Sequence, residues 1–342
     1  MKKILLLFVL FFVLNIFISG YSANSPYYEG ETIRIIVPHG PGGGFDTYAR
    51  MIQPFLEEYL PGSKVIVENI PGAGGEIGRN LAFMAKPDGY TICLTAGNDM
   101  VFNTIAGSES VKYKIDEWTY LARINAEPSI LTASARSEYD SFEDIVHSEE
   151  VLSFSCSGVG DADYFALGVT AHVFDFQLLP VTGYSGSKEA SLAVVRGEVD
   201  LWQPSLGTAL PLINNEDVKA IAIYSQERES MLPEVPTLLE IAVNEKFGLD
   251  EIDRKLIQAM INVNEVRRLI IAPPGMDERK TVILREAINK TLNDPKLVGF
   301  SKQINRSIAY MEGEKVAELI KEIMEIKEII KPILENTLKL AQ

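Results

Sequence analysis

The sequence predicts an α/β protein with two units, each a mainly parallel sheet flanked by helices. β-branched runs alternate with helical segments between residues 32 and 95, which is the order of a parallel sheet with crossover helices. The same alternation restarts near residue 118. A chain of 342 residues is also long enough for two such units.

The first unit is expected to place three loops at one edge of its sheet. Its strands are predicted at 32–37, 64–69 and 90–95, alternating with helices at about 45–59 and 76–85. The loops after these strands are Pro38 to Gly44, Pro71 to Gly75, and Thr95 to Asn98. Parallel strands end at the same edge of a sheet, where ligands of such sheets bind. Two of the loops are glycine-rich and precede helices, so their backbone N–H groups can face an anion.

The second unit repeats this design. We expect strands at 118–124, 129–133, 152–156, 178–181, 199–202 and 219–224. A capped helix is expected to open at Ser141, and further helices are expected at about 162–174 and 187–196. The loops after three of these strands are rich in serine, glycine and threonine, and such residues suit the binding of a small polar ligand.

Beyond residue 225 the alternation stops. Pro233 and Pro236 favour an extended segment at 232–237, because each proline disfavours helix before it. A helical stretch at 249–263, a strand at 268–276, and helices at 278–292 and 313–340 are predicted to follow. The last helix has one apolar face, which we expect to pack on a lobe, and Pro332 should kink or interrupt it.

The N-terminus predicts export. A basic start, Met1-Lys2-Lys3, precedes an apolar run from Ile4 to Ile18 and then small polar residues. These are the three parts of a secretory signal peptide, which we assign to residues 1–23, with an uncleaved anchor as the alternative. No other stretch has the length of a transmembrane helix. We therefore expect a periplasmic protein.

Charge and cysteine content narrow the function further. The formal net charge of −15 argues against nucleic-acid binding, because phosphates require a basic face. Backbone dipoles can still hold a small anion. Cys93 and Cys156 both lie in apolar, strand-like runs, so we expect buried free thiols, although export makes a disulfide an alternative.

Nucleotide and metal sites have little support. The first glycine loop continues with Phe45-Asp46, where a P-loop requires lysine and then serine or threonine. The dinucleotide fingerprint lacks its third glycine in both loops. His39, His147 and His172 are far apart in sequence, and none has a partner at metal-ligand spacing. We expect no metal and no cofactor.

One pattern keeps an enzyme open as an alternative. Ser185-Gly186-Ser187-Lys188 matches the short Ser-x-x-Lys pattern of penicillin-recognising enzymes. On this alternative the protein would be a secreted serine hydrolase that uses Ser185 and Lys188. The rest of that signature is absent. Asp46 could act as a base, but an acid in the first turn of a helix is also favoured by the helix dipole.

Motifs along the whole mature chain resemble those of the tripartite tricarboxylate transporter receptors, also called Bug-type solute receptors. The resemblance rests on these segments, in family order: Ile35 to Asp46, Val67 to Gly75, Lys86 to Thr91, Ser157 to Gly160, Gly183 to Gly186, Gly197 to Asp200, Leu232 to Thr237, Ala272 to Gly275 and Asn293 to Pro295. Each segment is a weak marker, and their combination is specific.

The resemblance implies a two-lobed periplasmic binding protein of the Venus flytrap, type II-like kind, with its ligand between the lobes. Lobe 1 would begin with residues 27–123, lobe 2 would take 124–228, and 229–342 would return to lobe 1 with a helical insertion and C-terminal helices. In this family the carboxylate is held largely by backbone N–H groups, hydroxyls and water, with no obligatory arginine.

The resemblance also implies most of a set of ligand-binding residues from both lobes, to which we add His39, Asp46 and Asp161. From lobe 1 they are His39, Pro41, Gly42, Gly43, Asp46, Ala73, Gly74, Gly75, Thr95, Ala96, Gly97 and Asn98. From lobe 2 they are Ser155, Ser157, Gly158, Asp161, Thr182, Gly183, Tyr184, Ser185, Gln203 and Ser205. No catalytic residue is expected.

The function predicted is capture of a small organic anion, a carboxylate, and its delivery to membrane subunits of a tripartite tricarboxylate-type transporter by a monomeric receptor. The alternatives are the serine hydrolase and a ligand-sensing partner of a two-component system. One feature departs from common members of the family: the helical stretch at 249–263 interrupts the usual run into the strand before Ala272. This departure places the chain in a divergent branch, whose ligand can differ from the usual tricarboxylates.

Overall fold

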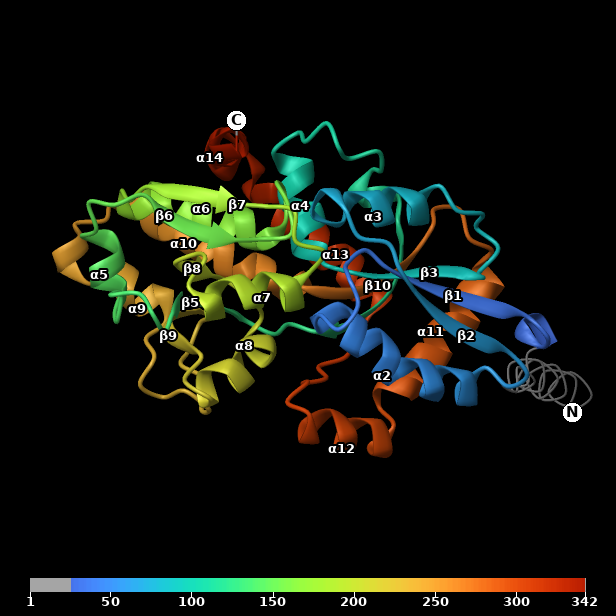
Figure 1. The fold of residues 1–342 in the computed structure, drawn as a ribbon. Helices are drawn as coiled ribbons and strands as arrows, with labels where there is room; N and C mark the ends of the chain where they lie inside the picture. Colours follow the sequence, from blue (N-terminus) through green and yellow to red (C-terminus); the bar gives the residue numbers. More distant parts are fainter. Residues whose placement is uncertain (1–25, 342) are drawn as a thin grey trace, which may run out of the picture.

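A computed structural model describes residues 26–341 and contains two β-sheets with helices packed around them (Figure 1). We call the first sheet with its helices lobe 1 and the second sheet with its helices lobe 2. The predicted signal peptide, residues 1–23, lies outside the described residues. None of the helices between residues 26 and 341 combines the length and apolar character needed to cross a membrane.

The sheet of lobe 1 has six strands in the spatial order β11-β4-β10-β3-β1-β2. These strands are β1 (Thr32–Val37), β2 (Lys64–Asn69), β3 (Thr91–Thr95), β4 (Thr119–Asn125), β10 (Arg268–Ala272) and β11 (Met311–Glu312). β1, β2 and β3 are parallel, as predicted. β10 runs antiparallel to both β3 and β4, so the amino end of β10 lies at the edge where β3 ends.

The sheet of lobe 2 has five strands in the order β7-β6-β8-β5-β9. They are β5 (Ser129–Ser134), β6 (Leu152–Ser155), β7 (Leu178–Val181), β8 (Leu201–Trp202) and β9 (Val218–Tyr224). β6, β7 and β8 are parallel, whereas β5 is antiparallel to both of its neighbours. The prediction of two α/β units with mainly parallel sheets is confirmed. The strand at 118–124, which the repeated pattern assigned to the second unit, is however β4 of the first sheet, where it pairs with β10.

Most predicted helices form where the periodicity placed them. The helices of lobe 1 include α2 (Gly44–Tyr59), α3 (Glu76–Phe83), α4 (Gly97–Ile105), α11 (Glu278–Leu292) and α12 (Pro295–Gln303). Lobe 2 carries α5 (Phe142–Val146), α6 (Ala162–Phe174), α7 (Ser187–Arg196), α8 (Leu206–Asn214) and α9 (Leu238–Ala242). The capping box expected at Ser141 is present, since its hydroxyl accepts from the Asp144 N–H and the Asp144 carboxylate accepts from the Ser141 N–H.

The helical stretch predicted at 249–263 forms α10 (Glu251–Val263), which packs against α6 and α9. The chain therefore re-enters the first sheet only at β10. The lobe boundaries stay a prediction.

The last predicted helix is interrupted, but upstream of Pro332. A 3-10 turn at Met324–Ile326 separates α13 (Gly313–Ile323) from α14 (Lys327–Thr337), and α14 continues through Pro332. α13 packs on β4 of lobe 1, whereas α14 packs on α6 of lobe 2. Val316, Ile320, Ile330 and Leu334 are buried on the predicted apolar face, as expected for a helix that packs on the protein.

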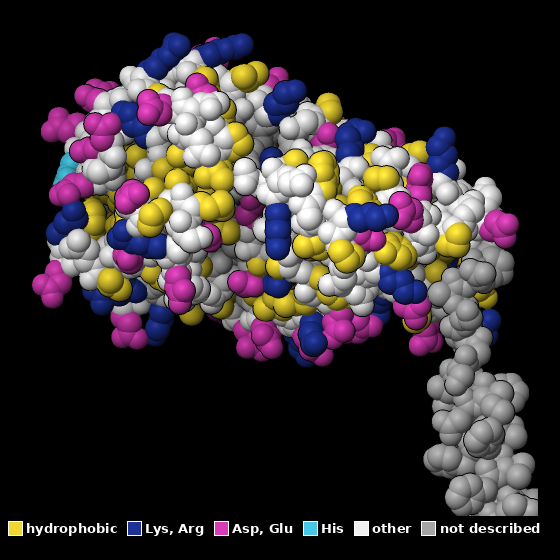
Figure 2. All heavy atoms as spheres, turned by 90° about the horizontal axis from the view of Figure 1, so that it is seen from below, with side chains coloured by type: hydrophobic (Ala, Val, Ile, Leu, Met, Phe, Trp, Pro, Cys, Tyr) yellow, Lys and Arg dark blue, Asp and Glu magenta, His cyan; other side chains and the backbone are white. Residues whose placement is uncertain are grey.

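The state of the two cysteines agrees with the prediction from the sequence. Cys93 and Cys156 are buried free thiols. On the face seen in Figure 2, acidic and basic side chains are interspersed over both lobes, with no continuous basic area on that face.

Candidate functional site

A cavity lies between the lobes, at the edge where the parallel strands of both sheets end. It contains about 430 Å³ of empty space, including the part open to solvent. Six of the residues expected to bind ligand line it, three from each lobe: His39, Ala96, Asn98, Ser157, Asp161 and Ser205. Gly44 and Phe45, from the glycine-rich stretch expected to face the ligand, also line it. The lining further includes residues that sequence reasoning did not assign to the site: Asp99, Ala162, Asp163, Ser187, Arg267 and Arg268.

Five helices contribute their first residues to this cavity. Gly44 and Phe45 open α2, Asn98 lies in the first turn of α4, Ala162 opens α6, Ser187 opens α7, and Ser205 caps α8. The first N–H groups of an α-helix have no partner within the helix, and the helix dipole is positive at this end. Convergence of these ends makes the cavity favourable for an anion.

Arg268 is the central charged group of the lobe 1 wall. Its guanidinium lies 4.6 Å from the ring centroids of both Phe45 and Tyr48, and only 1% of the residue is exposed. Nη2 donates to Glu127 Oε2 at 2.9 Å and to Ser205 Oγ at 2.8 Å. Nε and Nη1 have no hydrogen-bond partner among the described residues. A buried guanidinium with unpartnered N–H groups can donate to a carboxylate.

His39 packs on the same Phe45 ring as Arg268, and its imidazole is neutral. Its ring stacks on Phe45 at 4.6 Å between centroids. Burial lowers the pKa of His39 to about 3, and the nearby charges of Arg79, Arg268 and Arg267 add to the effect. A neutral imidazole can accept or donate one hydrogen bond to a ligand, and Nε2 has no partner among residues 26–341.

Replacing His39 with glutamine should flatten the dependence of stability on pH. The unfolded chain takes up a proton at His39 near pH 6.5, whereas the folded protein does so only near pH 3. Because the unfolded state binds more protons in this window, the free energy of unfolding should fall by about 1.4 kcal/mol per pH unit as the pH drops from 6.5. Urea unfolding at pH 7, 6 and 5 measures this slope, which His39→Gln should reduce and the exposed-site control His147→Gln should leave unchanged. Equal slopes for both variants would contradict the assignment.

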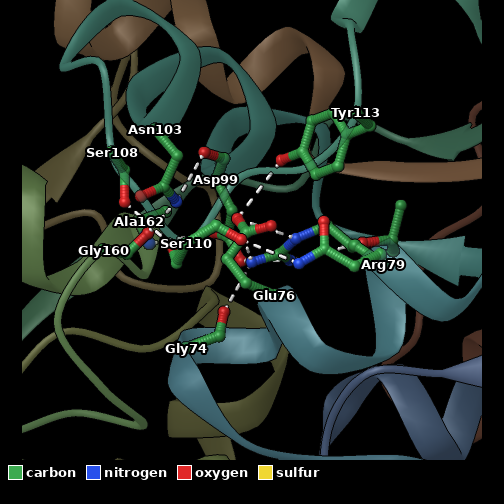
Figure 3. A network of polar contacts seen from close by, with 12 residues as sticks. Gly74, Glu76, Arg79, Asp99, Asn103, Ser108, Ser110, Tyr113, Gly160 and Ala162 are labelled. Atoms are coloured by element: carbon green, nitrogen blue, oxygen red, sulfur yellow. Dashed lines mark hydrogen bonds and ion pairs between the residues drawn. The ribbon is translucent and has the colours of Figure 1, made fainter. Parts of the chain in front are cut away.

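Behind the cavity wall, Arg79 is fully buried between two carboxylates (Figure 3). Its guanidinium lies 2.9 Å from Glu76 Oε1 and 2.9 Å from Asp99 Oδ2, and Nη2 also donates to the Gly74 carbonyl at 2.6 Å. Tyr113 donates to the same Glu76 oxygen. The ion pairs set the orientation of Asp99, whose second oxygen accepts from the Ala162 N–H of lobe 2 at 2.8 Å.

Further contacts between the lobes involve backbone atoms. Asn103 donates to the Gly160 carbonyl, and the Gly40 N–H donates to the Ser185 carbonyl at 2.5 Å. Gly74 and Gly158 pack directly, since a Cβ at Gly158 would lie 2.6 Å from the Gly74 nitrogen. The structure is therefore a closed form, in which glycines permit the close approach.

The other predicted site residues lie around the cavity rather than in its lining. Several hold the loops: the Gly42 N–H donates to Asp46, Thr95 accepts from Arg79, and Ser155 donates to the Ala190 carbonyl. Gln203 is buried and donates to Ser129, and Gly97 packs against the Val266 carbonyl. Those not yet placed lie in the two glycine loops or in the partly exposed loop after β7: Pro41, Gly43, Ala73, Gly75, Thr182, Gly183 and Tyr184. Their direct contact with a ligand stays a prediction.

Asp46 and Ser185 are engaged in local structure. Asp46 accepts from Gly42 and forms an ion pair with Arg50; burial raises its pKa, but the hydrogen bonds from Arg50 and Gly42 hold it below the usual range. The Ser185 hydroxyl donates to Glu189 at 2.8 Å and not to Lys188. This arrangement does not favour Ser185 as a nucleophile activated by Lys188.

Comparison with known proteins identifies the family. The model of the tripartite tricarboxylate transporter family receptor matches residues 48–335. The chain belongs to this receptor family.

The receptor is similar to proteins that carry the same fold. It is 27% identical to the protein BugT of Bordetella pertussis over 301 residues, covering 84% of this chain and 85% of BugT. The periplasmic binding protein BugD superposes with a TM-score of 0.75 at 23% identity, covering 90% of this chain and 98% of that one. MatC from Rhodopseudomonas palustris with bound malate superposes with a TM-score of 0.73 at 22% identity, covering 89% and 99%.

Arg267 and Arg268, which line the cavity, were not predicted as site residues, because the rule that ligands bind at the carboxyl ends of strands was applied to parallel strands alone. Sequence reasoning looked for ligand residues after strands, whereas Arg267 and Arg268 precede and open β10. Since β10 is antiparallel to β3, its amino end reaches the edge where β3 ends. Two adjacent arginines before a buried apolar strand were the available signal.

Proposed function

We propose that the receptor binds a small carboxylate in the cavity between its lobes and delivers it to the membrane subunits of a tripartite tricarboxylate-type transporter. The observation that carries the proposal is the convergence of five helix N-termini and unpartnered guanidinium N–H groups on one cavity. The malate bound to the similar protein MatC supports a carboxylate as the ligand class.

The proposed role is binding without turnover, by a monomer in the periplasm. The N-terminal pattern of a signal peptide and the periplasmic similar proteins support this location. Ligand would bind an open form and select the closed form described above, which would then be the form recognised by the membrane subunits. A net charge of −15 over the whole chain does not exclude anion binding, because helix ends and guanidinium groups at the cavity can act on a ligand at short range.

A thermal-shift panel tests the proposal. Ligands present at a hundred times their Kd should stabilise the protein by about 2.7 kcal/mol, because they bind the folded chain alone. The panel should contain di- and tricarboxylates, amino acids and aromatic acids, with sugars and amines lacking a carboxylate as controls. If a folded, ligand-free protein is stabilised by no carboxylate, or equally by the controls, the proposal fails.

A further inference from the structure

The cavity lining contains more acidic than basic groups, which is unexpected for a site that holds only anions. It includes three carboxylates, Asp99, Asp161 and Asp163, and two guanidinium groups, Arg267 and Arg268. A ligand with two or three carboxylates would add further negative charge to this buried space, where like charges repel strongly.

Two of the three carboxylates already have strong partners within the protein. Asp161 caps α6, accepting from the Tyr164 N–H and the Ser157 N–H at 2.7 Å each. Asp99 accepts from Arg79 at 2.9 Å and from the Ala162 N–H at 2.8 Å. These hydrogen bonds account for both oxygens of each group, so neither needs a ligand.

Asp163 is different. Among the described residues its carboxylate has one ion-pair partner, Arg267, at a long 3.5 Å, and its side chain is 23% exposed. A first-turn acid gains some stabilisation from the helix dipole. Burial and the charge of Asp161 nevertheless raise the pKa of Asp163 despite the opposing charge of Arg267, and a cationic ligand group beside Asp163 would favour its ionised form.

Residues that line this cavity carry unpartnered polar atoms of both kinds, donors and acceptors. Nε of Arg267, together with Nε and Nη1 of Arg268, are donors without a partner among the described residues, and both arginines are at most 6% exposed. Asn98, 1% exposed, has an acceptor oxygen without a partner. Buried polar groups require hydrogen bonds, so a ligand that satisfies this cavity must both accept and donate.

We propose that the ligand is a carboxylate that also carries a protonated amine, as an amino acid does, and that Asp163 is the partner of the amine. The carboxylate is held by the helix N-termini and the arginine N–H groups, and the ammonium by Asp163 with the Asn98 oxygen. This inference rests on the proposed function, and it adds the chemistry of the second ligand group. With one carboxylate such a ligand introduces no net charge into the cavity, and with two it introduces one negative charge fewer than the amine-free compound.

Matched pairs of ligands test the proposal on the unmodified protein. Calorimetric titration should compare aspartate with succinate, glutamate with glutarate, and leucine with 4-methylpentanoate, which differ only by the amine. In at least one pair we expect the amino compound to bind at least tenfold more tightly. Equal or tighter binding of the amine-free compound in every pair would overturn the proposal and leave carboxylate binding intact.

The variant Asp163→Asn tests whether Asp163 is the residue that binds the amine of the ligand. It should weaken binding of the preferred amino compound at least tenfold, whereas the amine-free compound should bind equally well or more tightly, because a negative charge near its carboxylate is removed. Asp175→Asn is the matched control, because Asp175 ends the same helix at the far end in a left-handed conformation that asparagine tolerates. Equal loss for both ligands of a pair, or no loss, would overturn the role of Asp163. If no compound of either kind binds to the folded protein, the proposed function itself fails.

Discussion

Replacing Arg79 with methionine is expected to reduce the free energy of unfolding by about 3–5 kcal/mol, because removing one partner of a buried ion pair leaves charge without compensation. Arg79 is fully buried, and its loss would leave Glu76 and Asp99, both nearly fully buried, without their cation. Protonation of these carboxylates would relieve the cost, so the destabilisation should shrink as the pH falls. Urea unfolding of the ligand-free protein at pH 8 and pH 5 measures both effects.

Arg34→Met is the matched control for this variant. Arg34 pairs with Glu68 at 3.1 Å, but their side chains are 34% and 44% exposed. Ion pairs in water contribute about 0–1 kcal/mol, so this variant should lose less than about 1 kcal/mol. If the two methionine variants lose similar stability, then the buried network does not have the role assigned to it.

Replacing Gly158 with alanine is expected to weaken ligand binding about 5- to 150-fold without lowering the stability of the ligand-free protein. The added Cβ would lie 2.6 Å from the Gly74 nitrogen, across the contact between the lobes. Overpacking of this kind costs about 1–3 kcal/mol, and here only the closed form would bear it. Calorimetric titration with the best carboxylate of the panel measures the affinity, and small-angle scattering shows whether the ligand still closes the lobes.

Gly299→Ala controls for the general effect of adding a methyl group. Gly299 lies in α12, and a Cβ there would have no atom within 4 Å. This variant should bind ligand like the unmodified protein. Gly158 has no positive φ, so an effect at that position comes from the contact between the lobes and not from backbone strain. Unchanged affinity for Gly158→Ala would show that the closed contact is not required for binding.

The periodicity of apolar residues and the residues that begin and end helices were sufficient to predict much of the fold. The bounds expected for α6, α7 and α11 agree with the structure, because each has a clear beginning: Asp161 and Asp277 cap two of these helices, and Gly186 precedes the third. α4, α8, α9 and α12 were not predicted. α4 and α8 start directly after a strand-end loop, without a capping hydrogen bond from a side chain, and their first turns read as part of that loop. α9 and α12 are short, although side chains cap both.

The site was predicted less completely than the fold, since it depends on contacts between distant segments. The glycine and serine loops pointed to the edge of each sheet at which the cavity lies. Asp161 was expected there, but the other charged residues were not, because Asp163 reads as a first-turn helix acid and Arg267 follows a helical insertion. Asp161 accepts two short hydrogen bonds, whereas Asp163 has one long ion pair, with Arg267, and this difference between neighbouring acids depends on the tertiary structure.

Burial of the two cysteines makes the protein suitable for labelling with thiol-reactive dyes at introduced cysteines. Cys93 lies in β3 and Cys156 follows β6, so each lobe buries one thiol. Burial raises the pKa of Cys93 to about 12 and that of Cys156 well above its usual range, so little thiolate forms near neutral pH. These are the two cysteines of the whole sequence. A cysteine introduced at an exposed position on each lobe would therefore react with a dye selectively, and the distance between two dyes would report closure as an optical signal.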